Sequence, residues 1–169
     1  MAPTMRKILL SASFLLAAAT PAMAATAANG PVSLGVFSDW TAADYAVGQT
    51  HVCYAFSRAI GAAKAPTAPM IIVSERPASR DEVVVNAEKA FPDKTDVSVQ
   101  IDTQPAMSFY TAANRAYARD GRAAVIGMQK GAQAVASWKG KTGHDRKETF
   151  SLTGFSAAYG AIVKACPAK

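Results

Sequence analysis

The segment "FSLTGFSAAYGAIVKAC", residues 150–166, combines a strand pattern, a glycine and an amphipathic helix near the end of the chain. Before Gly154, the apolar residues Phe150 and Leu152 alternate with hydroxyl side chains, as in a half-buried strand. After it, six residues at helical spacing form one apolar stripe: Phe155, Ala158, Tyr159, Ile162, Val163 and Cys166. Pro167 then predicts the end of the helix. We therefore expect the fold to close on a strand, a glycine turn and a helix that carries a cysteine on its buried side.

The N-terminus has the three parts of a secretory signal peptide. Arg6 and Lys7 form a basic segment, residues 8–19 form an apolar run, and residues 22–24 (Ala-Met-Ala) form a small-x-small cleavage site. The run is shorter than the roughly 20 apolar residues of a membrane span, so no transmembrane span is expected; a retained anchor is the alternative. The predicted parts of the chain are a signal peptide (1–24), a flexible leader (25–31) and a single domain (32–169). Such a protein would be periplasmic, envelope-associated or secreted.

Export determines how the two cysteines of the chain are interpreted. Exported proteins with an even number of cysteines usually pair them, and Cys53 and Cys166 form the one possible pair. The bridge would join an early strand to the final helix and close a loop of roughly 110 residues, worth about 4–5 kcal/mol in the chain-entropy model. Two buried free thiols are the alternative. Two cysteines and two distant histidines are too few for a metal site, so neither a metal nor a cofactor is expected.

Short apolar runs separated by turn residues fill the rest of the chain. The predicted strands are at 33–40, 50–58, 70–77, 81–87, 96–102, 106–111, 132–140 and 149–153. Residues 123–130 indicate a short internal helix that ends at Gly131. Residues 50–58 are apolar on both sides of the strand, which suits a strand that is covered on both faces. This spacing predicts a mainly β protein, either an antiparallel sandwich or a partly open barrel, with one internal and one C-terminal helix.

Basic residues are concentrated in the second half of the chain. The net charge is +6, and residues 115–147 contain eight Lys or Arg against two Asp. The candidate binding surface comprises Arg115, Arg119, Arg122, Lys139, Lys141, Arg146 and Lys147. Such a surface would attract an anionic envelope or host-surface component, whereas an exported protein rarely meets nucleic acid. A solvated basic face without a ligand is the alternative.

The sequence contains no recognisable catalytic motif. His51 and His144 are the only histidines, and there is no G-x-S-x-G elbow, P-loop or H-E-x-x-H motif. We therefore predict that the protein is not an enzyme and assign no catalytic residue.

Four pieces of the sequence, in this order, are similar to one known family. They are Asp39-Trp40, Cys53, the Met-Gln-Lys-Gly segment at 128–131, and the Thr-Phe-Ser-Leu-x-Gly-Phe block at 149–155 that leads into a helix ending at Cys166. Together they resemble the invasion-associated locus B (IalB) family of alphaproteobacterial envelope proteins, over residues 36–166. The resemblance implies an exported, immunoglobulin-like β-sandwich with paired cysteines and no catalytic residues. The sequence departs from the family pattern at Gln129, where a second basic residue is expected, and in the turn at 139–147. These differences bear on whether it shares the family's binding surface, more than on the fold.

These observations predict an exported, non-enzymatic envelope protein that acts by binding. Two alternatives are an envelope enzyme or enzyme inhibitor whose site is assembled from scattered residues, and a structural or stress-related periplasmic factor. A pocket that holds His51 or His144 beside a carboxylate and a hydroxyl would favour the enzyme.

Overall fold

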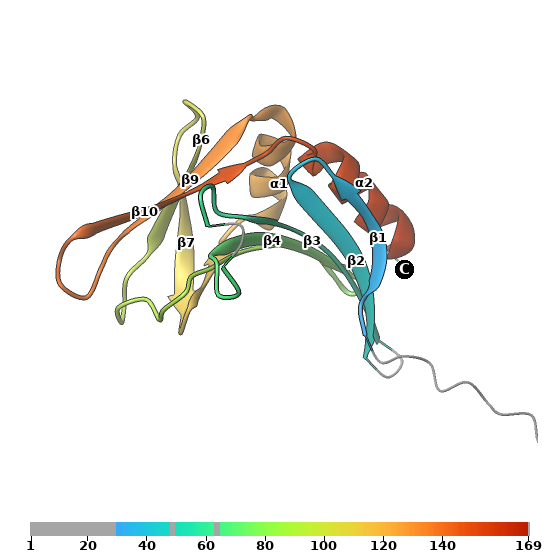
Figure 1. The fold of residues 1–169 in the computed structure, drawn as a ribbon, viewed down its shortest axis with the longest axis horizontal. Helices are drawn as coiled ribbons and strands as arrows, with labels where there is room; N and C mark the ends of the chain where they lie inside the picture. Colours follow the sequence, from blue (N-terminus) through green and yellow to red (C-terminus); the bar gives the residue numbers. More distant parts are fainter. Residues whose placement is uncertain (1–29, 48–49, 63–64, 169) are drawn as a thin grey trace, which may run out of the picture.

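The computed structural model describes residues 30–47, 50–62 and 65–168. The predicted signal peptide and all but the last two residues of the predicted leader lie outside these residues. In the described part of the chain, ten strands form one antiparallel sheet with two helices (Figure 1). The order of strands in the sheet is β1-β2-β3-β4-β5-β8-β7-β6-β9-β10.

The elements follow the chain as a series of hairpins. The strands are β1 (Val32–Phe37), β2 (Trp40–Val47), β3 (Thr50–Arg58), β4 (Met70–Arg76), β5 (Ser79–Asn86), β6 (Val97–Ile101), β7 (Met107–Ala112), β8 (Arg115–Ala118), β9 (Gln133–Lys139) and β10 (Asp145–Ser151). The helices are α1 (Gly121–Lys130) and α2 (Phe155–Ala165). The Asp120 side chain caps α1 by accepting a hydrogen bond from the Ala123 N–H at 2.9 Å.

The prediction of a mainly β, antiparallel protein with an internal and a C-terminal helix is confirmed. The immunoglobulin-like sandwich is not shown, because β5 pairs with β8 and the ladder continues through all ten strands as one sheet that is not closed. Two strands escaped the sequence patterns. The alanine-rich β2 lacks clear alternation, and β8 was obscured because Arg115, Arg119 and Arg122 have near-helical spacing.

The last strand returns to the region where the sheet begins. The Ile60 N–H, just after β3, donates to the Thr149 carbonyl oxygen of β10 at 2.8 Å. The Trp40 indole N–H, at the start of β2, donates to the Ser151 carbonyl oxygen at 3.0 Å. In Figure 1, β10 accordingly crosses the sheet close to β3. These contacts hold β10 beside β2 and β3 without closing the sheet, and one continuous core lies inside.

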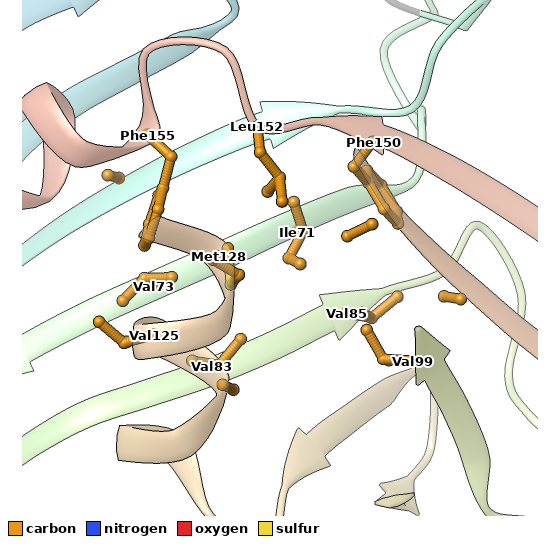
Figure 2. Close-up of a cluster of buried hydrophobic side chains, with 14 of the residues drawn as sticks. Ile71, Val73, Val83, Val85, Val99, Val125, Met128, Phe150, Leu152 and Phe155 are labelled. Atoms are coloured by element: carbon orange, nitrogen blue, oxygen red, sulfur yellow. The ribbon is translucent and has the colours of Figure 1, made fainter. Parts of the chain in front are cut away.

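That core lies between the helices, β10 and one face of the sheet. Figure 2 shows side chains from β4, β5, α1 and β10 converging on one cluster, which includes Ile71, Val73, Val83, Val85, Val125, Met128, Phe150, Leu152 and Phe155. Trp40 is fully buried, with its ring centroid 4.7 Å from that of Phe155. On α2 four of the six predicted stripe residues are buried, Phe155, Ala158, Ile162 and Cys166, whereas Tyr159 and Val163 are partly exposed.

The predicted bridge between Cys53 and Cys166 is present, with the two Cα atoms 5.9 Å apart. It joins the middle of β3 to the residue that ends α2, so the final helix is fastened to the sheet. Neither described helix has the length and apolar content needed to cross a membrane.

One expectation for β3 was wrong. Cys53, Ala55 and Ser57 point into the core and are buried, but Tyr54 and Phe56, on the other face, remain partly exposed. Both helices pack on the first face, so the described structure covers β3 on one side only (Figure 1). The apolar character of the second face therefore has no explanation in the core.

Candidate functional site

The seven predicted binding residues lie on several different elements. Arg115 begins β8, Arg119 follows it, Arg122 is in the first turn of α1, Lys139 ends β9, Lys141 is in the β9–β10 turn, and Arg146 and Lys147 are on β10. The β9–β10 hairpin thus carries four of the seven. In Figure 1 it projects away from α1, which carries Arg122.

Three of the seven form ion pairs with carboxylates of the same chain. These are Arg119–Asp96 at 2.9 Å, Arg122–Asp81 at 3.5 Å and Lys139–Asp145 at 2.7 Å. The Ser108 hydroxyl and then Arg119 lower the pKa of Asp96, and Lys139 lowers the pKa of Asp145. Within the described residues, no ion pair involves Arg115, Lys141, Arg146 or Lys147. These four therefore keep more of their capacity to bind an external anion.

Two of these four, Lys141 and Arg146, line a cleft of about 250 Å³ between the β9–β10 hairpin and residues 87–92. We call it the hairpin cleft; its other polar and aromatic lining residues are Glu88, Lys89, Trp138, Thr142 and Glu148. Arg146 is directly opposite Trp138 in the β9–β10 ladder, so both side chains are on the same face. Lys147 is opposite Ser137 and points to the other face.

Trp138, the aromatic residue that lines the cleft, is held in place by packing against Phe91. The Phe91 ring packs edge-on against the Trp138 indole, with centroids 5.1 Å apart and an interplanar angle of 80°. A second cavity, of about 420 Å³, is also lined by residues 90–92 and by Lys141. Lys141 can therefore reach a ligand in either space.

Charges of both signs meet in the hairpin cleft. Burial raises the pKa of the Glu148 carboxyl, Arg146 opposes this rise, and Glu88 adds to it. In the described part of the chain, the cleft's three cations and two carboxylates form no ion pair with one another. The cleft thus offers guanidinium and ammonium donors, carboxylate acceptors and an indole face to one ligand.

A second polar cluster lies beneath the end of α2, where it holds elements of the fold together. Glu75 on β4 is fully buried, its carboxylate 2.6 Å from Arg80 Nε and 3.2 Å from the Asp81 N–H that donates to it. The Arg80 guanidinium also donates to the Cys166 carbonyl oxygen, and the Tyr159 hydroxyl donates to Asp81. The cluster fastens the first residues of β5 to α2 beside the disulfide.

Burial raises the pKa of Glu75 from its ordinary 4.5 to about 7, although the Asp81 N–H and Arg80 act in the opposite direction. The folded protein therefore holds this proton at pH values where the unfolded chain has released it. The free energy of unfolding should then fall as the pH rises from about 4.5 to 7. The stabilisation by the proton on Glu75 is fully present below pH 4.5 and is lost above pH 7.

We expect Glu75→Gln to abolish this component of the pH dependence. The slope of unfolding free energy against pH between 4.5 and 7 should become more positive by up to about 1.4 kcal/mol per pH unit. Urea unfolding at a series of pH values measures the slope, with Glu82→Gln on the neighbouring strand as the control. Identical slopes for wild type and Glu75→Gln would contradict the assignment.

The two histidines lie outside the hairpin cleft. His51 Nδ1 is 3.3 Å from the Asp44 carboxylate in an exposed pair, and His144 is exposed in the β9–β10 turn. Asp44 also lies close to Cys53 and Cys166, but both sulfurs are bonded to each other and cannot bind a metal as thiolates. Within the part of the chain that the structure describes, neither histidine lines the hairpin cleft or the second cavity.

The sequence patterns did not identify most of the lining of the cleft. Trp138 has the same strand parity as the buried Ala134 and Ala136, so alternation along the strand does not distinguish it from a core residue. Its position at the end of β9 leaves it partly exposed. Glu88 and Lys89 lie in a loop far away in sequence, and no local pattern connects them to the hairpin.

Comparison with protein-family models gave no match, and neither did comparison with characterised proteins. Among solved structures, the chain is similar to one described as invasion associated protein B from Bartonella henselae. The alignment has a TM-score of 0.55 and 11% sequence identity, and covers 79% of this chain and 97% of the other. The predicted resemblance to the invasion-associated locus B family is thus supported at the level of the fold: the chain folds similarly to invasion associated protein B.

Proposed function

We propose that the protein is an exported, non-enzymatic envelope protein that binds an anionic envelope or host-surface component in the hairpin cleft. The Cys53–Cys166 disulfide supports an oxidising, extracytoplasmic location, because such bonds persist outside the reducing cytosol. The similarity in fold to invasion associated protein B agrees with this setting. The observation that carries the proposal is that Lys141 and Arg146 face the cleft without an ion-pair partner among the described residues.

The chemistry of the cleft suits an anionic group attached to a larger, partly apolar unit. Arg146 presents the planar donor geometry that binds carboxylate or phosphate through two hydrogen bonds. The Trp138 indole would pack against the apolar part of the ligand, and Glu88 and Glu148 would accept hydrogen bonds from its hydroxyl groups. The two carboxylates would also repel ligands of very dense negative charge.

The test compares two lysines of the same hairpin. Lys141 lines the cleft, whereas Lys147 points away from it, and a glutamine at either position changes the net charge equally. We expect Lys141→Gln to weaken binding of a hyaluronan-derived oligosaccharide, whose carboxylates are widely spaced, about tenfold, the effect of losing one charge-assisted hydrogen bond. Lys147→Gln should change the dissociation constant less than about twofold, since an exposed charge is screened by salt. Surface plasmon resonance at physiological ionic strength provides both constants.

Equal weakening by the two substitutions would mean that the probe responds to diffuse positive charge and would contradict a defined site. Failure of the wild-type protein to bind any acidic glycan or envelope fraction would contradict the proposed function as a whole. Arg146→Gln provides a second variant in the cleft, and its effect should equal or exceed that of Lys141→Gln.

A further inference from the structure

The face of the sheet opposite the helices carries a continuous apolar row. Consecutive strand registers align its members across five neighbouring strands: Phe56 on β3, Ile72 on β4, Val84 on β5, Tyr117 on β8 and Tyr110 on β7. We call these five residues the apolar row. At the typical strand spacing of roughly 4.8 Å, it extends about 19 Å.

Neither described helix covers this row. The helices α1 and α2 pack on the other face of the sheet, as Figure 1 shows. Tyr110 is 45% exposed, and Phe56, Ile72 and Tyr117 are partly exposed, whereas Val84 in the middle of the row is buried, with 7% exposure. The Tyr110 and Tyr117 rings stack with centroids 5.3 Å apart, so the row ends in a flat aromatic pair. Exposed apolar side chains on four of five neighbouring strands are typical of a binding surface.

Positive charge borders the row. The Arg58 guanidinium lies over the Phe56 ring, 5.8 Å from its centroid. Arg58 and Arg115 are in the next cross-strand row, which runs through Met70 and Asn86. Neither arginine forms an ion pair within the described residues, whereas the nearby Arg119 is paired with Asp96. The flank thus attracts a ligand that is both apolar and anionic.

The position of the row in the sheet restricts what can occupy it. Strands β3, β4, β5, β8 and β7 are each hydrogen-bonded on both sides, so an extended peptide cannot join the sheet there. A peptide laid across the row would leave backbone groups without partners, and a sugar would find no hydrogen-bonding side chain along Phe56, Ile72 and Val84. An acyl chain has no polar groups to satisfy. The length of the row is comparable to the depth of one bilayer leaflet, about 15 Å.

A second copy of this chain fits less well than an anionic ligand. Two such faces packed together would bring Arg58 and Arg115 of each copy into one desolvated interface, where Glu82 and Asp96 are already paired with arginines of their own copy. We therefore propose that the apolar row binds the acyl chain of an anionic lipid, whose charged headgroup lies against Arg58 or Arg115. This site is separate from the hairpin cleft.

The experiment measures binding of palmitoyl-lysophosphatidylglycerol, below its critical micelle concentration, by isothermal titration calorimetry. Ile72 is in the row, and Ile126 is a 39% exposed isoleucine on α1. We expect Ile72→Gln to weaken binding about tenfold or more, through loss of apolar contact, and Ile126→Gln to change it less than about twofold. Arg115→Gln should weaken binding of this lipid but leave binding of palmitoyl-lysophosphatidylcholine unchanged.

Several results would overturn the proposal. They are no binding by the wild-type protein, equal losses for Ile72→Gln and Ile126→Gln, and loss through Lys141→Gln, which would place the lipid in the hairpin cleft. Sedimentation velocity tests whether a second copy of the chain occupies the row instead. A wild-type dimer that Ile72→Gln dissociates would show this and overturn the lipid proposal. Tyr117→Ser, at a partly exposed position, replaces Ile72→Gln if that variant does not fold.

Discussion

Replacing Cys53 and Cys166 together by alanine is expected to lower the free energy of unfolding by about 2–5 kcal/mol. The bond spans 113 residues and joins β3 to the residue that ends α2, so its loss frees the unfolded chain from a long closed loop. Both cysteines are buried, and alanine leaves no unsatisfied polar group in their place. Urea unfolding followed by tryptophan fluorescence measures the change.

Reduced wild-type protein is the control for this effect. If the bridge itself is responsible, reduced wild type and the double alanine variant should unfold at similar urea concentrations. A double variant as stable as the oxidised wild type would show that packing alone holds α2 on the sheet. In that case the cysteines would contribute little to the stability of the fold.

Replacing Gly154 by alanine is expected to cost about 3 kcal/mol, because two effects act at once. Gly154 has a φ of +92°, which residues with a Cβ adopt only with strain. A Cβ at this position would also lie 1.9 Å from the Phe37 carbonyl oxygen, so the turn at Ser38 would have to move. This turn carries Asp39, whose N–H donates to the Thr153 carbonyl oxygen, and precedes Trp40.

Gly160 provides a matched control in the same segment. It is in the middle of α2, and a Cβ there would meet no atom within 4 Å. Gly160→Ala should therefore stabilise the protein by about 0.5–1 kcal/mol through higher helix propensity. Thermal unfolding of both variants checks the prediction. Two effects of the same sign would contradict the assigned role of Gly154.

The contrast between the two glycines shows where local sequence information stops. The pattern around Gly154 predicted a turn between a strand and a helix, but not that the turn is pressed against the β1–β2 hairpin. The pattern around Gly160 left open whether another backbone approaches it. Only the tertiary structure separates the two, since close approach depends on segments more than 100 residues away.

The periodic features of this protein can be predicted from its sequence. The sequence placed most of the strands, both helices, the buried stripe of α2 and the pairing of Cys53 with Cys166, because each depends on local spacing or on there being one possible pair. Strands β2 and β8 were missed where composition obscured the alternation. The tertiary structure alone decided that the strands form one sheet, which basic residues are neutralised by distant carboxylates, and which side of β3 is covered. These outcomes depend on contacts between segments that are remote in sequence. A local pattern predicts the side of a strand or helix on which a side chain lies, but not the residues that it contacts there.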